Sequence, residues 1–247
     1  MSTLEGKIVL LIGGSSGIGF AVAKASLLSF ASHVVIASSS PQKVKDAVTR
    51  LEETISQKSL PGRATGYVVD AHDSAAIRAL VTKVGEIDHL VWTSGEPLKI
   101  GFPNIDLDTV RNAFDVRFWG ALVAAQSAKF KPGGSVTMTV GTVVVKPRPT
   151  WTVAAGVSGA VDAVARGLAV DLAPIRVNVI SPGIVKTELW DTIPPAQKEK
   201  IWSQAEATLL VKHLCEPEEI AEAYLFVMKC GFITGQRLEV DGGFKYV

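Results

Sequence analysis

The stretch "KIVLLIGGSSGIGFA", residues 7–21, decides the fold of this chain. Its apolar part, 7–13, predicts a strand that is buried on both faces, and the residues from 19 onward predict a helix. Gly13, Gly17 and Gly19 follow the spacing GxxxGxG, which permits a tight turn and lets a diphosphate approach the backbone at a helix N-terminus. This context predicts a dinucleotide site, with a turn that serves packing alone as the alternative. Other residues of the loop expected to contact the dinucleotide are Ser15, Ser16 and Ile18.

The rest of the chain alternates short β-branched runs with longer helical patterns. The predicted strands are 7–13, 33–38, 66–71, 88–95, 134–141, 175–181 and 236–243. The predicted helices are 19–30, 41–55, 74–85, 106–130, 152–172 and 217–229. Continuous apolar strands joined by helices indicate parallel strands with crossovers on both faces. We therefore expect an α/β fold with one doubly wound, parallel, seven-stranded sheet and a ligand at the carboxyl ends of its strands.

Composition argues against several classes of function. The chain has 25 Lys and Arg against 24 Asp and Glu, and this net charge of +1 does not point to nucleic acid or an anionic membrane surface. The two cysteines and four histidines are scattered without a metal-ligand spacing. The N-terminal apolar run is too short for a signal peptide, and no apolar segment approaches the ~20 residues of a membrane span. We expect a cytoplasmic protein without a metal, nucleic-acid or membrane partner.

The end of the second predicted strand bears on which dinucleotide binds. An NAD site usually has an Asp or Glu here to hold the ribose hydroxyls. This chain instead has Ser38, Ser39 and Ser40, with Lys43 one helical turn later. Hydroxyls and an ammonium group accommodate a 2′-phosphate that a carboxylate would repel, so we expect NADP(H) as the cofactor. The alternative is that these serines only cap the next helix.

Several motifs lie in the order and at the separations found in one family. They are "GGSSGIG" (13–19), Asp70 after the third strand, "RGLAVDLAPIRVNVI" (166–180), "SPGIVKTELW" (181–190) and "ITGQRLEVDGG" (233–243). In these motifs the chain resembles the short-chain dehydrogenase/reductase family over nearly its whole length. The resemblance implies a single Rossmann-like domain over 1–247. Further cofactor contacts implied by the resemblance are Asp70, Ala71, Ser94, Gly95, Pro182, Gly183, Val185 and Thr187.

The same resemblance bears on assembly. In the family, the helices that correspond to 106–130 and 152–172 pair across a two-fold axis. We therefore expect a homotetramer or a homodimer.

The chain departs from the family at the positions that carry its chemistry. The family's helix asparagine falls on Arg117, and its serine falls on Gly141, with Thr142 beside it. Its tyrosine and lysine fall on Ala154 and Ser158. In the family the tyrosine protonates the alkoxide that forms as hydride arrives, a proton transfer that contributes about 10²–10⁴-fold. Ordinary carbonyl reduction should therefore be poor.

Three functions remain open. The protein can reduce a substrate that needs no proton donor, such as an iminium; it can promote a non-redox step such as a cyclisation by positioning the substrate; or it can bind a dinucleotide without catalysis. Residues "VRFWGAL" around Arg117, with the tyrosine-free "W…AG" segment, resemble atypical members of the family that include fungal bifunctional reductase/Diels–Alderases. This resemblance implies a small-molecule substrate, aromatic or alkaloid in type, in specialised metabolism.

Three residues are candidates for catalysis: Arg117, Thr142 and Trp151. Arg117 can donate hydrogen bonds from a permanently charged guanidinium, or it can form a structural salt bridge with Asp115 or Asp162. Thr142 can replace the family serine or be an ordinary strand-end residue.

Four tryptophans and three charged residues near the predicted site need separate interpretations. Trp151 and Trp190 can stack on a flat substrate, whereas Trp92 and Trp119 are expected in the core. Glu96 can stabilise a cation or be a solvated loop carboxylate. Lys146 and Arg148 are expected to face solvent.

The serine run generates the first testable prediction. NADPH should bind more tightly than NADH, because no carboxylate at the end of the second strand repels the 2′-phosphate. Calorimetric titration of the purified protein with both dinucleotides measures the two dissociation constants, and equal values would contradict the prediction.

Overall fold

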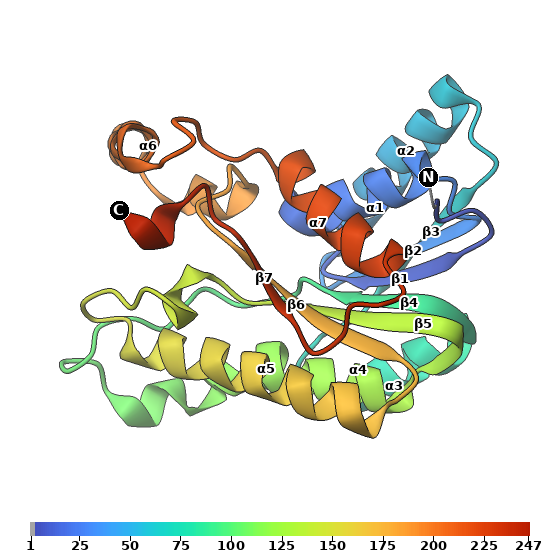
Figure 1. Cartoon of the computed structure of the whole chain (residues 1–247), viewed down its shortest axis with the longest axis horizontal. Coiled ribbons are helices and arrows are strands. Elements are labelled where there is room, and N and C mark those ends of the chain that lie inside the picture. The colour runs from blue at the N-terminus through green and yellow to red at the C-terminus, as the bar shows by residue number, and fades with distance from the viewer. Residues whose placement is uncertain (1–2) are drawn as a thin grey trace.

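The computed structural model describes residues 3–247, which form one seven-stranded sheet covered by helices on both faces (Figure 1). The strands are β1 (Ile8–Ile12), β2 (His33–Ser38), β3 (Arg63–Val68), β4 (Glu86–Trp92), β5 (Lys129–Thr139), β6 (Arg176–Pro182) and β7 (Arg237–Val240). The helices are α1 (Gly17–Leu28), α2 (Pro41–Lys58), α3 (Ser74–Val84), α4 (Ala121–Ser127), α5 (Thr152–Asp171), α6 (Pro195–Thr208) and α7 (Pro217–Lys229).

The strand order is β3-β2-β1-β4-β5-β6-β7, and every neighbouring pair is parallel. The order reverses between β1 and β4, so the segments that follow these two strands lead to helices on opposite faces of the sheet, an arrangement that leaves room for a ligand at their carboxyl ends. This arrangement confirms the doubly wound parallel sheet that was expected from the sequence.

Two hydrophobic cores sandwich the sheet. Alternate residues of β1 point to opposite faces: Val9 and Leu11 pack under α1 and α7, whereas Leu10 and Ile12 pack against the side covered by α3, α4 and α5. Figure 1 shows α1, α2 and α7 above the sheet and α3, α4 and α5 below it. The strands are apolar along their length because both of their faces are buried.

Several predicted boundaries were wrong at both edges of the sheet. β3, β4 and β5 begin earlier than predicted, at Arg63, Glu86 and Lys129, because these polar first residues still pair with a neighbouring strand, although the β4–β5 register shifts between Ile87 and His89. Residues 69–71, 93–95 and 241–243, predicted as strand, instead form turns and loops at the carboxyl edge.

The predicted long helix over 106–130 is wrong. The segment consists of a 3₁₀ turn (Leu107–Phe114), a π-helical turn (Asp115–Gly120) and the short α4. Lys129 and Phe130 belong to β5, where they pair with β4. At Gly120 a Cβ atom would lie 2.8 Å from the Ala71 carbonyl oxygen, so this close packing requires glycine. The π-helical turn carries Arg117, in keeping with the frequent occurrence of such turns at functional sites.

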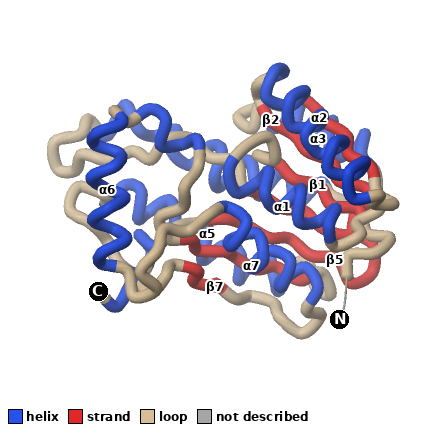
Figure 2. The backbone as a smooth tube through the Cα atoms, turned by 90° about the horizontal axis from the view of Figure 1, so that it is seen from above, coloured by secondary structure: helices blue, strands red, loops and turns tan. Residues whose placement is uncertain are grey.

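Helix α6 has no counterpart among the predicted helices. No α6 residue falls in the buried class, and Figure 2 shows the helix standing to one side of the layered sheet. Periodicity could not reveal it, since a helix that buries so little shows no clear apolar stripe.

The core also contains a histidine whose protonation opposes folding. His89 on β4 is 2% exposed, and its Nδ1 lies 2.8 Å from the Ser135 hydroxyl oxygen. Burial lowers the pKa of His89 from 6.5 to about 4. Because the unfolded chain takes up this proton at higher pH than the folded chain, stability is fully present above pH ~6.5 and falls as the pH drops towards ~4.

The second prediction follows from the lowered pKa of His89, which makes the folded protein less stable as the pH falls. His89→Leu should flatten the loss of unfolding free energy between pH ~6.5 and ~4 by up to about 3 kcal/mol. Chemical denaturation at a series of pH values measures the slope.

The exposed His213 provides the contrasting control. Its hydrogen bond to Glu219 raises the pKa of His213, so its contribution to stability is present at low pH, and His213→Asn should not flatten the profile. An unchanged slope in the His89 variant would show that another group dominates acid unfolding.

Candidate cofactor and substrate site

The glycine-rich loop lies against the loop that follows β4. Gly13 has a φ of +97°, and a Cβ there would lie 2.5 Å from the Ser94 amide nitrogen. A Cβ at Gly19 would lie 2.2 Å from the Gly13 carbonyl oxygen. The packing of the protein itself therefore excludes side chains at both positions, which leaves a bare backbone at the start of α1.

The start of α1 already holds an anion. The Ser16 side chain makes no capping hydrogen bond, and the first turn of α1 contains no acidic residue. Instead, the Gly17 N–H donates to Glu188 Oε2 at 2.8 Å, from the segment that follows β6. This carboxylate stands where a helix N-terminus binds phosphate, so the residues present fit the diphosphate of a dinucleotide.

The remaining predicted cofactor residues gather along the carboxyl edge of the sheet. The end of β1 leads into Ser15, Gly17 and Ile18, and the end of β6 leads into Pro182, Gly183 and Val185. Thr187 lies directly over the glycine loop, because a Cβ at Gly17 would be 3.1 Å from Thr187 Cγ2. Ser94 and Gly95 follow β4, and Asp70 and Ala71 follow β3, where the Asp70 carboxylate accepts a hydrogen bond from the His72 N–H.

The three serines after β2 have different roles. Ser40 caps α2 through a hydrogen bond from the Lys43 N–H to its hydroxyl oxygen, so the capping alternative holds for this residue. Ser38 is half-buried at the strand end, whereas Ser39 and the Lys43 side chain are exposed. No carboxylate stands among them in the sequence.

Arg117 lies on the π-helical turn and packs on the backbone of Gly95. A Cβ at Gly95 would be 2.4 Å from Arg117 Cζ, and Arg117 NH2 donates to the Glu96 carbonyl oxygen at 2.6 Å. Burial lowers the pKa of Arg117 and the Glu96 carboxylate opposes this shift, but a guanidinium remains charged at neutral pH.

The salt bridges considered for Arg117 are not formed. Asp115 lies 4.0 Å from His72, and Asp162 pairs with Arg166 and Arg237. The guanidinium is held instead by one backbone carbonyl, which leaves it further N–H donors.

A small cavity joins Arg117 to α5. Its lining is mostly apolar and consists of Glu96, Pro97, Leu98, Lys99, Ala113, Arg117, Val153, Ala154 and Val157. Ala154, where the family motifs predict the tyrosine position, thus shares a cavity with Arg117. Ser158 lies one turn further along α5 and is 5% exposed. A Cβ at Gly141 would meet no atom within 4 Å, so this position faces open space.

Thr142 and Trp151 are not among the described residues that line this cavity. Thr142 begins a 3₁₀ turn, Thr142–Val144, and Trp151 precedes α5 with Arg148 5.4 Å from its ring centroid. Trp190 donates from Nε1 to the Val185 carbonyl oxygen and meets Trp202 of α6 edge-on at 6.4 Å.

The two tryptophans that were expected in the core differ. Trp92 is buried, but the expectation was wrong for Trp119, which is 57% exposed. The neighbouring Gly120 packs against the Trp92 ring, and Trp119, one position earlier on the helical turn, faces outward.

Three charged residues near the site also differ from expectation. Lys146 donates to the Phe244 carbonyl oxygen at 3.0 Å, and Arg148 lies 4.8 Å from the Phe244 ring. Both are half-buried against the C-terminal turn, so the expected solvent-facing position was wrong. Glu96 pairs with His72 at 3.2 Å and is therefore not a lone solvated carboxylate.

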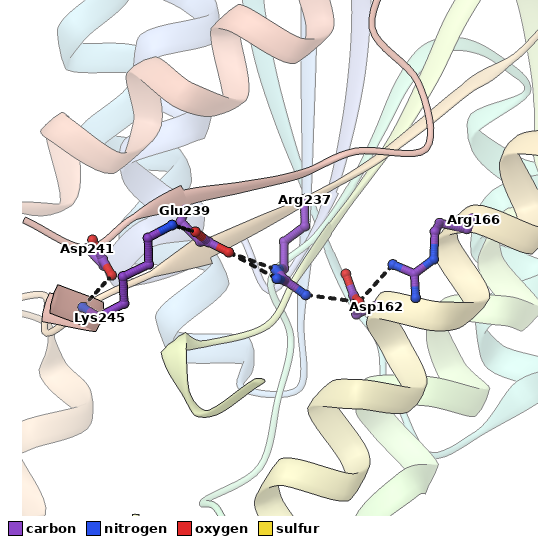
Figure 3. Close-up of polar contacts among 6 residues, drawn as sticks. All are labelled: Asp162, Arg166, Arg237, Glu239, Asp241 and Lys245. Atoms are coloured by element: carbon purple, nitrogen blue, oxygen red, sulfur yellow. Dashed lines mark hydrogen bonds and ion pairs between the residues drawn. The ribbon is translucent and has the colours of Figure 1, made fainter. Parts of the chain in front are cut away.

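A network of charges fixes α5 to β7 and the C-terminal turn (Figure 3). The Asp162 carboxylate lies 2.8 Å from Arg166 and 3.0 Å from Arg237, and Arg237 also contacts Glu239 at 3.0 Å. Lys245 continues the network from Glu239 to Asp241. Asp162 is two turns along α5 from Ala154, so the network holds the helix that forms one wall of the cavity.

Sequence reasoning missed Glu188 and this network. A carboxylate directly after Thr187, in a segment expected beside the cofactor, was the available signal for Glu188. The network had no comparable signal, because its members are separated by up to 83 residues and meet only in the fold.

Helix α5 also corrects the expectation about membrane spans. Of the helices in residues 3–247, α5 alone is long and apolar enough to cross a membrane by length and composition. One face of α5 is buried, with Ala154, Val157, Val161 and Ala165 as its apolar residues, as in the core helix of a folded domain. No group of three or more His, Cys, Asp or Glu within the described part of the chain is arranged to hold a metal ion.

Fold and site together define a dinucleotide-binding α/β protein, and comparisons with known proteins identify its family. Residues 2–247 match the SDR-like Rossmann domain. The chain is 38% identical to the short-chain dehydrogenase/reductase ucsE of Acremonium sp., over 97% of this chain and 96% of ucsE. It therefore belongs to the short-chain dehydrogenase/reductase family, as its motifs indicated, and to the oxidoreductase class of enzymes.

Two solved structures are also similar. The MalC reductase/Diels–Alderase from Malbranchea aurantiaca superposes with a TM-score of 0.91 at 30% identity, covering 100% of this chain and 99% of MalC. A small-chain dehydrogenase in complex with NADPH superposes with a TM-score of 0.81 at 28% identity, covering 98% of this chain and all of the other.

The third prediction concerns the network around Asp162. Asp162→Ala leaves Arg237 without its partner on α5 and should lower the free energy of unfolding by about 1–3 kcal/mol. Asp171→Ala, at the exposed end of the same helix, should change it by less than about 0.5 kcal/mol. Chemical denaturation of both variants tests this, and equal effects would mean that the network does not stabilise α5.

Proposed function

We propose that this protein binds NADP(H) along the carboxyl edge of its sheet and reduces an activated, cationic substrate of the iminium type, or promotes its cyclisation. The observation that carries this proposal is the cavity beside the cofactor edge. At the family's tyrosine position it has Ala154, which has no proton to donate, and it contains the permanently charged Arg117. A lining of this kind suits a reaction that needs charge stabilisation and no proton donor, and the small cavity would have to widen to admit the substrate.

The cofactor half of the proposal rests on the residues that would hold a dinucleotide. The bare loop at Gly13 and Gly19 and the anion-binding N–H of Gly17 suit a diphosphate. Ser38, Ser39 and Lys43 suit a 2′-phosphate, in line with the NADPH held by a similar dehydrogenase. The other residues assigned to the cofactor are Ser15, Ser16, Ile18, Ser40, Asp70, Ala71, Ser94, Gly95, Pro182, Gly183, Val185 and Thr187.

The chemical half follows from proton balance. When bound, the nicotinamide would supply a hydride. A ketone that accepts hydride becomes an alkoxide and needs a proton, whereas an iminium carbon that accepts hydride becomes a neutral amine because the C=N π electrons return to nitrogen. Replacement of tyrosine, lysine and serine by Ala154, Ser158 and Gly141 therefore harms the first reaction and not the second.

Arg117 would hold the substrate. Its single hydrogen bond to the Glu96 carbonyl leaves other N–H groups free to donate to a substrate carbonyl or carboxylate. A fixed donor aimed at an oxygen that gains negative charge stabilises the transition state without reorganisation. Thr142 and Trp151 lie outside the cavity lining, and we assign them supporting roles only.

A cyclisation is supported by a separate observation. MalC, which matches this chain over nearly its whole length, is a reductase/Diels–Alderase. A cavity that orients a substrate can accelerate a cycloaddition by restricting its conformations, without further catalytic groups. The substrate would be a small aromatic or alkaloid-type molecule.

The decisive experiment compares two substrate classes. NADPH oxidation is followed with a preformed cyclic iminium and with a simple ketone of similar size. The proposal expects turnover on the iminium and little on the ketone. Turnover on the ketone alone, or on neither with no cyclised product, would refute it.

We also propose that the protein forms a homodimer or homotetramer. The outer face of α5 supports this, because Gly156, Gly159 and Gly167 have open space around them and Val170 is 76% exposed. Trp119, on the neighbouring π-helical turn, is exposed as well. Small residues allow a second copy to approach closely, and its apolar contacts would cover this face.

The fourth prediction tests Arg117. Arg117→Ala should leave the fold and NADPH binding nearly intact and should lower turnover at least about tenfold, since loss of one preorganised donor typically costs about 10²–10³-fold. Arg117→Lys should retain only part of the wild-type turnover, because the planar geometry of the guanidinium is lost.

The matched control is Arg111→Ala, since the Arg111 side chain is 82% exposed on the preceding turn. It should retain wild-type turnover. If Arg117→Ala unfolds the protein, the residue is structural; if the variant is folded and fully active, Arg117 has no part in the mechanism.

The fifth prediction tests the loss of the acid. The double variant Ala154→Tyr with Ser158→Lys should remain a poor ketone reductase, because Arg117 and Gly141 still replace the asparagine and serine of the relay. Adding Arg117→Asn and Gly141→Ser should raise ketone turnover, as the space around Gly141 admits a side chain. Ordinary ketone turnover in the double variant alone would show that the site has been misread.

A further inference from the structure

The cofactor loop makes one contact with a distant carboxylate that the proposed function does not use. The Gly17 N–H donates to Glu188 Oε2 at 2.8 Å, across 171 residues of sequence. Thr187 and Glu188 both lie over this glycine, since a Cβ there would be 3.1 Å from Thr187 Cγ2 and 3.4 Å from Glu188 Oε2. The carboxylate thus occupies the backbone donor that a diphosphate needs.

The chemistry of this position explains why a carboxylate lies there. The first backbone N–H groups of a helix have no partner within the helix and attract anions. In α1 the Ser16 side chain makes no capping hydrogen bond and the first turn has no acidic residue. Glu188 is therefore the group that neutralises the start of α1, and it uses the same donor and the same sign of charge as a phosphate.

Glu188 also begins the segment that stands apart from the sheet. It is the first residue of a 3₁₀ turn, Glu188–Thr192, which leads into α6. Figures 1 and 2 show α6 beside the layered body, in which α1 and α7 pack on the sheet. We call residues 188–208 the flap.

Several contacts of the flap are internal or lie at its ends. Lys198 pairs with Asp191 at 3.3 Å, and Trp190 meets Trp202 edge-on. The chain returns to the body after the flap, where the Leu210 N–H donates to the Gly242 carbonyl oxygen. No α6 residue is in the buried class, and a segment with few buried residues opens at low free-energy cost, so the charged hydrogen bond at its start helps to hold it.

A groove separates the flap from α1. Its lining includes Gly17 and Phe20 on α1, and Glu188, Asp191 and Trp202 on the flap. The Glu188 carboxylate therefore lies at the wall of an open groove, and its side chain can leave Gly17 without disturbing the core.

We infer that Glu188 is an internal competitor for the diphosphate site, an inference that rests on the proposed binding of NADP(H). In the free protein its carboxylate caps α1 and holds the flap against the glycine loop. The dinucleotide binds only when Glu188 leaves, because two anions cannot share the Gly17 N–H. Cofactor binding is thereby coupled to release of the flap that carries Trp190, and the apparent affinity is reduced by the fraction of protein in the closed form.

The first test measures affinity by calorimetry in the full-length protein. Glu188→Ala should tighten NADPH binding about three- to tenfold, and Glu188→Gln, which keeps an oxygen acceptor but loses the charge, should lie between it and the wild type. Asp191→Asn is the matched control, since it removes the same charge from the same flap but not from Gly17, and it should leave the affinity within about twofold of wild type.

A ligand without a diphosphate separates this inference from the proposed function. Adenosine 2′-monophosphate carries the adenosine end and the 2′-phosphate only, so its affinity should be the same in wild type and Glu188→Ala. Tightening of both ligands alike would indicate a general charge effect and overturn the inference. If wild type binds NADPH and Glu188→Ala binds it equally well or more weakly, the inference fails while the proposed cofactor stands; if no variant binds NADPH, both fail.

The second test needs no cofactor. Amide hydrogen exchange at Gly17 and across the flap should be faster in Glu188→Ala than in wild type, whereas Asp191→Asn should match wild type in exchange at Gly17. Addition of NADPH to wild type should speed exchange in the flap while it protects Gly17. Unchanged exchange at Gly17 in Glu188→Ala would show that the carboxylate does not cap α1, and the inference would be wrong.

Discussion

The first backbone N–H groups of α1 have no acceptor within their own helix, and much of this structure is arranged around them. To expose these groups at the end of β1, the chain uses glycines that pack too closely against the β4 loop to carry side chains. The doubly wound sheet then places the ends of β2, β3, β4 and β6 around the same point. An anion is needed there on electrostatic grounds, and in the free protein Glu188 supplies it.

The part of the site beside α5 contains a positive charge, the guanidinium of Arg117. Arg117 is half-buried against Gly95 with one backbone acceptor, and the Glu96 carboxylate nearby offsets part of the cost of removing the guanidinium from water. In the proposed function, Arg117 would favour substrates that present an oxygen to it, and the small Ala154 would leave space at the position where the family motifs predict the proton donor.

The two segments beside the proposed site, α5 and the flap, differ in how firmly they are held. The wall formed by α5 is tied to β7 and the C-terminal turn through Asp162, Arg237 and Glu239, so it can hold a substrate in one orientation. The flap lines a separate groove beside α1, and its helix α6 buries none of its residues fully. A cavity that restricts its substrate needs a firmly held wall. A site that must admit a large dinucleotide needs a neighbouring segment that can move.

The sequence by itself determined the architecture and the location of the cofactor edge. Apolar β-branched runs, helical periodicity and the glycine spacing are local signals, and each reflects a residue's own backbone preference or its burial on one face. Family motifs also predicted that Arg117 and Ala154 belong to the site, and the structure brings both to the lining of one cavity. Local signals failed in 106–130, where helical periodicity does not distinguish 3₁₀, π and α turns, and in α6, which has too little burial to show a pattern.

Only the tertiary structure decided how charges pair. The Asp162 carboxylate pairs with Arg237 and not with Arg117, and the Glu96 carboxylate pairs with His72. The Glu188 carboxylate accepts a hydrogen bond from the Gly17 backbone N–H. The partners in each case are far apart in the sequence. Such pairs depend on which strand ends and helix faces the fold brings together. A charged residue shows no sequence pattern that identifies its distant partner. The pairing that makes the cofactor loop an anion site already occupied by the protein's own carboxylate could therefore be found only in the folded chain.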